Sequence, residues 1–281
     1  MKTLKSFIEK TTIILLLGML VISLVNCTGG KKGESADDSS AESKIDKEEI
    51  HENLREVIYP LPTAFEVTEM INKIEASYII GLANETSNVD KYFTDKDQAI
   101  NLGVFHSDLS YASTYNMKQE VMNYMEASEN LVIELGITGA FSIDFIDDVE
   151  ANINNKDVLV DIISESFYDT YEYLVKNNKE DLSLLVLAGT WIEAMYISCN
   201  ISETVYHNPE MVKVILHQKS SLDKLIELLA EHNEHETIQA VLVDLKPIKD
   251  VYDSVDETGI TEDQLNTIIE QANSVRNKII L

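Results

Sequence analysis

Apolar residues recur at steps of three and four along most of the chain, which is the period of an amphipathic helix. Gly81, Gly136 and Gly259 end three of these runs, as glycine commonly does at helix C-termini. Alternation with a period of two, typical of strands, is lacking over any useful length. The runs cover residues 63–81, 95–115, 117–135, 142–154, 157–174, 182–199, 209–230, 237–246, 251–255 and 261–278. The pattern predicts a single all-α bundle of about eight or nine helices.

Three local motifs refine the boundaries of these helices. Asn208-Pro209 combines an N-cap residue with a proline at the first helical position. Thr261 and Gln264 form a capping box at the start of the last helix. Pro247 follows the run 237–246, and we expect it to break or kink that helix because proline has no N–H to donate.

The most apolar run, 182–199, predicts the central helix of the bundle. Its polar side chains up to residue 197 are Ser183, Thr190 and Glu193 alone. A helix that is apolar all round is normally buried all round. Cys199 lies at the end of this run, where we expect a buried and unreactive thiol.

The first 27 residues have the order of a secretory signal peptide. Three lysines precede an apolar run of 13 residues, which covers roughly 20 Å and is short of a hydrocarbon core of about 30 Å. The run ends in Leu24-Val25-Asn26-Cys27, which resembles the lipobox of bacterial lipoproteins of the Bacteroidetes type. The resemblance implies cleavage before Cys27 and lipid attached to that residue. Asn26 departs from the Gly, Ala or Ser usual in that family.

The chain therefore divides into three parts. Residues 1–26 are the expected signal peptide, and 27–58 are the lipidated cysteine with a flexible, acidic tether poor in apolar residues. Two prolines within 59–62 open the folded domain, 59–281. The expected location is the bacterial cell envelope, lipid-anchored at the outer membrane, with the periplasmic and surface sides both left open.

Charge excludes one large class of partners. The chain has 22 Lys+Arg against 49 Asp+Glu, so a nucleic-acid backbone would be repelled. Removal of residues 1–26 leaves 19 basic against 48 acidic residues. Attachment to a membrane must then come from lipid on Cys27 and not from basic residues.

One stripe of the run 95–115 carries candidate chemistry. At 100° per residue, Asn101, Asp108, Tyr111 and Tyr115 lie close together on the predicted helix, whereas His106 lies some 160° from Asp108. Aromatic rings beside an acid and an amide could line a pocket for a polar, partly apolar ligand such as a sugar or peptide. The alternative is the half-buried edge of a core helix.

Trp191 and Glu193 of the central helix extend this candidate pocket. Glu193 has apolar neighbours and could be a desolvated carboxylate with a raised pKa, suited to proton transfer or to ligand binding. Alternatively it points to a wet side of the helix or meets a buried partner.

Metal and cofactor motifs are not apparent. His232 and His235 are three residues apart and have carboxylates nearby, but no third well-spaced ligand is visible, and we expect a solvated turn there. Glu48 to His51 is the only Glu-x-x-His, and it lies in the tether, which disfavours a di-iron bundle. Phosphate loops and nucleophile elbows are also lacking. We expect neither a metal nor a cofactor, and assign no catalytic residue.

These features predict a lipid-anchored, non-enzymatic helical domain that binds a small ligand or a protein partner near the outer membrane. One alternative is an envelope enzyme that uses Glu193 or Asp108, and it would require acids from different helices to meet in one pocket. Another is a structural spacer, which would have no pocket.

Overall fold

The computed structural model describes residues 64–141, 144–201, 205–257 and 259–280. They all belong to one compact unit, Glu49–Leu281. The predicted signal peptide, Cys27 and the tether lie outside the described residues.

The described part of the chain is helical and contains no strand, which confirms the all-α fold class. Its nine α-helices are α3 (Ala64–Lys73), α4 (Asp95–Thr114), α5 (Lys118–Glu134), α6 (Phe145–Asn152), α7 (Lys156–Lys176), α8 (Glu180–Asn200), α9 (Pro209–Glu231), α10 (Glu236–Asp253) and α11 (Glu262–Ile280). Three short 3-10 helices, η1 (Thr86–Lys91), η2 (Thr138–Ala140) and η3 (Val205–His207), lie in the connections.

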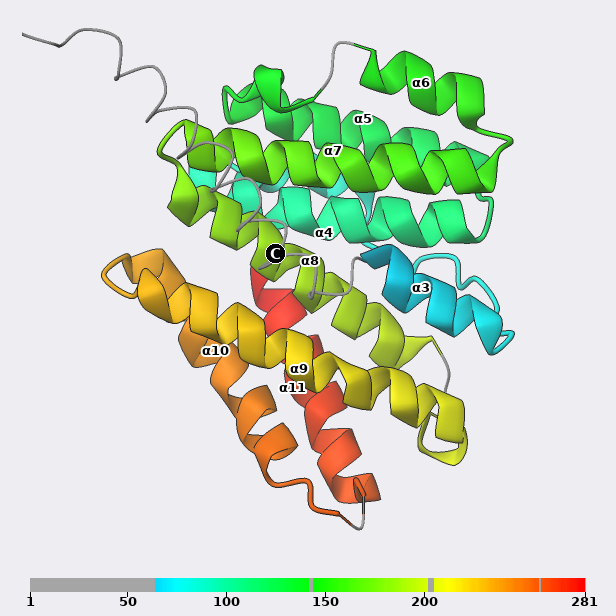
Figure 1. Cartoon of the computed structure of the whole chain (residues 1–281), viewed down its shortest axis with the longest axis vertical. Coiled ribbons are helices and arrows are strands. Elements are labelled where there is room, and N and C mark those ends of the chain that lie inside the picture. Colours follow the sequence, from blue (N-terminus) through cyan, green and yellow to red (C-terminus); the bar gives the residue numbers. More distant parts are fainter. Residues whose placement is uncertain (1–63, 142–143, 202–204, 258, 281) are drawn as a thin grey trace, which may run out of the picture. The chain divides into compact units, whose positions relative to one another are not determined.

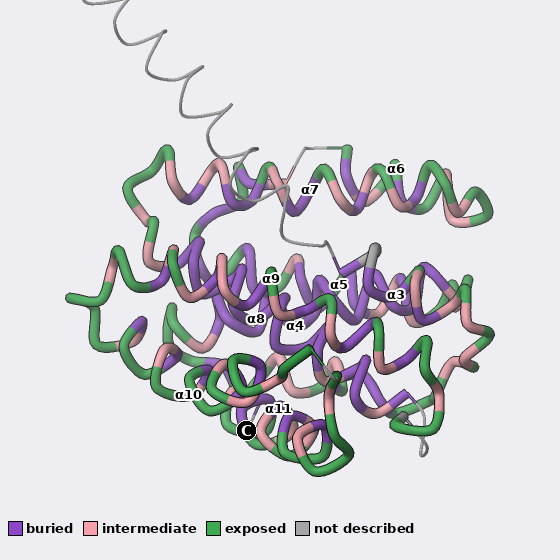
Figure 2. Tube along the Cα trace, turned by 60° about the horizontal axis from the view of Figure 1, so that its bottom comes forward, coloured by how far each residue is buried: buried purple, intermediate pink, exposed green. Residues whose placement is uncertain are grey.

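Helix α8 runs between two groups of helices (Figure 1). Helices α4, α5, α6 and α7 lie on one side of it, and α9, α10 and α11 lie on the other. Helix α3 packs against α4 near one end of the bundle. Burial agrees with this arrangement of the helices. Buried residues run almost without interruption along α4 and α8, whereas the outer helices have a buried and an exposed face (Figure 2).

Two glycines allow α4 and α8 to cross at backbone contact. A Cβ added to Gly103 would stand 2.0 Å from the carbonyl oxygen of Val186, and one added to Gly189 would stand 1.9 Å from that of Ile100. Side chains of any size would separate the two helices at this point. The crossing explains why both helices are buried on nearly every side.

The central position of α8 confirms the prediction from its apolar run. Leu185, Ile192 and Ile197 are among its fully buried side chains. The helix is also long and apolar enough to cross a membrane by length and composition alone, but 94% of that apolar window is buried inside the domain. Its apolar character is therefore accounted for by its neighbours in the bundle.

The predicted helix caps at Asn208 and Thr261 are present. Asn208 Oδ1 accepts hydrogen bonds from the backbone N–H groups of Glu210 and Met211. Thr261 Oγ1 accepts from the N–H of Gln264, whose Oε1 accepts from the N–H of Thr261. Local sequence therefore determines where α9 and α11 begin.

Two other boundaries differ from the prediction. Helix α3 ends at Lys73 and not near Gly81, and Glu75 has a left-handed φ of 62°. Hydroxyls from α4 hold the segment that follows, since Tyr111 Oη accepts from the N–H of Ile79 and the hydroxyl of Tyr115 donates to the carbonyl of Ala76. These tertiary bonds replace the helical ones that the apolar spacing favoured.

Helix α10 continues through Pro247, where we expected a break or a kink to end it. Pro247 lies on the exposed side of the helix, and Val243, one turn earlier, is also exposed. The carbonyl group that loses its helical donor therefore faces water, which limits the cost of the missing N–H.

Candidate functional site

Two acids and one arginine from three different helices meet in the core. Glu193 of α8 accepts hydrogen bonds from Arg276 of α11, with 3.0 Å from Nε to Oε2 and 3.1 Å from Nη2 to Oε1. Asp108 of α4 is close enough for the charges of both partners to act on it. Glu193 and Asp108 are each 0% exposed, and Arg276 is 7% exposed. We call these three residues the acid–arginine cluster.

The environment of Asp108 favours the neutral form of its carboxyl group. Burial raises its pKa well above the usual value, and the negative charge of Glu193 raises it further, while Arg276 and the N–H of Asn84 act in the opposite direction. That N–H donates to Asp108 Oδ2 over 3.2 Å. Asp108 Oδ1 is buried and has no hydrogen-bond partner among the described residues. The site therefore raises the pKa of a carboxyl group that is a stronger acid in water.

Glu193 is the member that pairs with the arginine. Burial raises its pKa, and the charge and hydrogen bonds of Arg276 lower it. The guanidinium group of Arg276 also lies 4.3 Å from the ring centroid of Tyr196, on the next turn of α8. The neutral form of Asp108 leaves one negative and one positive group in the cluster.

The other predicted pocket residues bind backbone groups. Asn101 Nδ2 donates to the carbonyls of Asp97 and Ile279, which ties α4 to the end of α11. The hydroxyls of Tyr111 and Tyr115 hold the chain that follows α3, as described above, and Tyr78 stacks on Tyr111 with 4.6 Å between ring centroids.

Trp191 lies on α8 and is also buried, and its indole Nε1 has no hydrogen-bond partner among the described residues. Five of the six predicted pocket residues are buried, and Tyr115 is half-buried; the buried five are Asn101, Asp108, Tyr111, Trp191 and Glu193. A pocket formed by them remains a prediction.

A separate cavity lies on the opposite side of α4, beside His106. Its volume is about 20 Å³, which is room for about one water molecule. None of the six predicted pocket residues lines it. Its lining residues are Leu102, His106, Leu109, Ser128, Phe141, Phe145, Ser166, Phe167, Thr170 and Val186.

Two polar side chains give this cavity its chemistry. Burial lowers the pKa of His106 to about 3, so its imidazole is neutral and has one donor and one acceptor nitrogen. The imidazole stacks on Phe167 with 4.5 Å between ring centroids. Ser128 Oγ is buried and has no hydrogen-bond partner among the described residues. Ser166 and Thr170, in contrast, donate to backbone carbonyls of their own helix.

Sequence reasoning did not find Arg276 or His106 as site residues. Arg276 lies on the apolar stripe of α11, next to Val275 and one turn after Ala272, and a single arginine on such a stripe indicates a buried anionic partner. His106 was set aside because it does not share a face with Asp108. The structure confirms that separation and places the histidine against α7.

Comparison with known proteins adds no family to these observations. No family model, curated protein or solved structure matches this chain.

Proposed function

We propose that the chain is a lipid-anchored protein of the bacterial envelope whose helical domain binds a small neutral molecule near the outer membrane. The N-terminal sequence supports the anchor, because Cys27 follows an apolar run and precedes a polar tether. The cavity beside His106 supports binding of a small molecule over binding of a protein partner, and a plain spacer would need no cavity.

The lining of the cavity suits a ligand with an apolar body and one hydrogen-bonding group. Such a ligand must push the lining side chains apart, because the cavity itself has room for about one water molecule. Three phenylalanine rings form much of its wall, and none of its lining residues carries a charge at neutral pH, because His106 is neutral. Ser128 offers a hydroxyl without another partner. An ionic ligand would lose its hydration without gaining a counter-charge.

Titration with phenol and benzene tests this binding function. Phenol matches the chemistry of the lining, because its ring matches the aromatic wall and its hydroxyl matches Ser128, and its binding requires the wall to open around it. We expect phenol to shift the NMR signals of the His106 ring in a saturable way. Ser128→Ala should weaken phenol binding and leave benzene binding unchanged.

Ser221→Ala is the matched control, because Ser221 on α9 is equally buried and without a partner but lies outside the cavity. Failure of both phenol and benzene to bind the wild-type chain in a saturable way would contradict the small-ligand proposal. Equal weakening of phenol binding in the two serine variants would remove Ser128 from the site.

Cys27→Ser tests the anchor independently of the ligand. We expect the wild-type chain in the membrane fraction, with an intact mass that corresponds to residues 27–281 plus lipid. The Cys27→Ser chain should leave that fraction while retaining its helical circular dichroism spectrum. Membrane attachment of Cys27→Ser, or cleavage elsewhere in the wild type, would contradict the lipid anchor.

One observation favours an enzyme as a second candidate, since acids from α4 and α8 do converge. Asp108 has the raised pKa of a general acid. Both acids are completely buried, however, and neither lines the described cavity. A crystal soak that places a ligand against Asp108 instead of His106 would favour the enzyme, and ligand at His106 alone would favour the binding protein.

A further inference from the structure

The turn between α9 and α10 gathers three side chains that are common metal ligands. His232, Glu234 and His235 each have a ligand atom within 4.8 Å of the others. The side chains of His235 and Glu234 approach to 3.5 Å between Nε2 and Oε1. The sequence indicated two histidines with carboxylates nearby and no third well-spaced ligand. The backbone of the turn brings the carboxylate of Glu234 close to both histidines.

Hydrogen bonds fix the shape of this turn. The N–H of His232 donates to the carbonyl of Leu229, and the N–H of His235 donates to the carbonyl of His232 over 3.2 Å. The Gln239 side chain donates to the carbonyl of Asn233 over 2.6 Å. The turn therefore brings the two histidines together without any metal, which lowers the ordering cost of binding one.

A further carboxylate, outside this group of three, approaches His232 from another helix. Glu180, the first residue of α8, lies with Oε2 3.9 Å from Nε2 of His232. Glu180 is 52 residues from His232 in the sequence, so no local spacing rule could have paired them. The four side chains are partly exposed, between 28% and 65%, and this leaves them free to turn toward a common centre.

We propose that His232, His235, Glu234 and Glu180 bind one Zn²⁺ ion. Two imidazole nitrogens and two carboxylate oxygens form a set that zinc accepts in tetrahedral geometry, at about 2.0–2.2 Å from each ligand. Further acids on both sides of the turn, Glu231 and Glu236, raise the local concentration of cations. The ion joins the N-terminal end of α8 to the tip of the α9–α10 hairpin and so acts as a structural crosslink.

Calorimetric titration with ZnCl₂ tests this site on the full chain, purified in detergent without a histidine tag. We expect one saturable site per chain. His232→Ala and His235→Ala should each weaken Zn²⁺ binding at least about tenfold. Glu180→Gln should weaken it while leaving residual binding, because three ligands of the turn remain.

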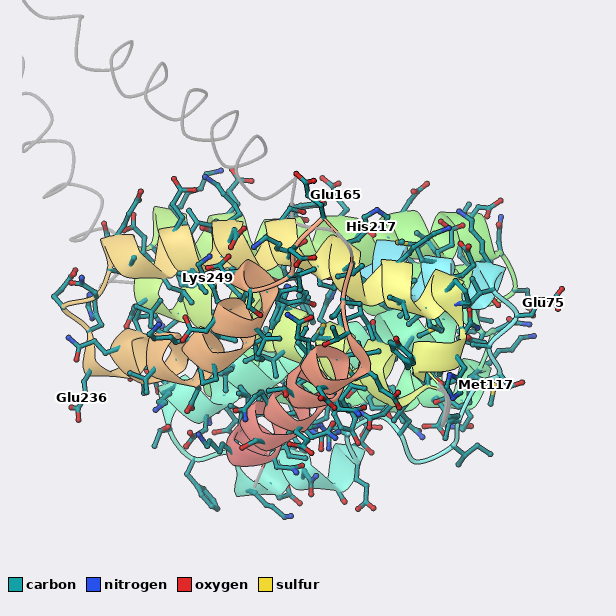
Figure 3. All side chains as sticks on the ribbon, turned by 90° about the horizontal axis from the view of Figure 1, so that it is seen from below. Glu75, Met117, Glu165, His217, Glu236 and Lys249 are labelled. Carbon is teal, nitrogen blue, oxygen red and sulfur yellow. The ribbon has the colours of Figure 1, made fainter. Side chains whose placement is uncertain are left out.

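His217→Ala is the matched control. His217 is exposed on α9, 15 residues before His232 and roughly 22 Å away along the helix axis. Figure 3 shows it well separated from Glu236, which marks the tip of the hairpin. Its variant should bind Zn²⁺ like the wild type.

Three results would overturn the proposal: no saturable binding to the wild-type chain, wild-type affinity in the His232→Ala/His235→Ala double variant, or an equal loss in His217→Ala. Wild-type affinity in Glu180→Gln would overturn the crosslink to α8. The melting temperature gives a second readout, since Zn²⁺ should raise it for the wild type and not for the double variant.

Discussion

Arg276 is the cation that makes a buried glutamate tolerable in this core. Its two hydrogen bonds to Glu193 satisfy both carboxylate oxygens. A buried ion pair often contributes little relative to an apolar pair of the same volume, but removal of one partner leaves the other charge without compensation. The two sides of the pair are therefore best tested together.

Arg276→Met should lower the free energy of unfolding by about 3–5 kcal/mol, because it leaves the Glu193 carboxylate buried alone. The double variant Glu193→Gln/Arg276→Met should recover part of that loss. Urea denaturation of both variants measures the coupling. Losses that simply add in the double variant would show that the two side chains do not depend on each other.

Asp108→Asn should flatten the dependence of stability on pH. Native Asp108 keeps its proton above the pH at which the unfolded residue loses it, near 3.9. The native state thus binds more protons in that window, and the free energy of unfolding falls as pH rises toward the raised pKa. Asparagine carries no titrating proton, so its variant should lose this slope.

Urea denaturation at a series of pH values from about 5 to 8 measures the slope for Asp108→Asn. Asp147→Asn is the matched control, because the same change on an exposed residue of α6 removes no buried proton. A steeper fall with pH in Asp108→Asn than in the wild type would contradict a protonated Asp108.

At the scale of elements, the contact between α4 and α8 depends on Gly103 and Gly189. Gly103→Ala and Gly189→Ala should each lower the free energy of unfolding by at least about 3 kcal/mol, because the added methyl group would overlap the backbone of the partner helix. Thermal or urea denaturation measures the loss. Gly139→Ala is the control, since its new methyl group would meet only the Tyr173 ring, which can turn aside. Similar costs at Gly103 and Gly139 would argue against backbone contact.

The sequence was sufficient for the helices whose signals are local. The capping residues of α9 and α11 bond to backbone groups no more than three residues further along the chain. The apolar run of α8 has almost no polar side chains, and this alone predicts its burial. The end of α3 could not be predicted, because the tyrosines that hold the next segment lie on α4. Continuity through Pro247 depends on which side of α10 faces water, and this is set by the packing of that helix.

The candidate site required knowledge of distant partners. Glu193 was identified from its apolar neighbours, and Asp108 from the amide and aromatic side chains on the same stripe of its helix. Arg276 lies 83 residues from Glu193, and the distance between them is fixed only when α11 packs on α8. The cavity beside His106 is likewise lined by residues from five helices, α4 to α8.

At the scale of the molecule, acidic surface charge opposes compaction. Residues 64–281 contain 39 Asp+Glu and 14 Lys+Arg. Raising NaCl from about 10 mM to about 100 mM shortens the Debye length from about 30 Å to about 10 Å. We expect the melting temperature to rise by a few degrees as repulsion is screened. Choline chloride should raise the melting temperature in the same way. An unchanged or lower melting temperature in both salts would contradict repulsion between the acidic residues.

The place of Arg276 in the chain also bears on biogenesis. It lies on α11, 83 residues after Glu193, so both acids are synthesised before it. Until α11 docks, the Glu193 carboxylate lies beside Asp108 without its cation, and its burial is costly. Completion of the core thus depends on synthesis of α11. A chain truncated before residue 276 should stay partly open and be cleaved more readily by proteases, which act on unfolded segments.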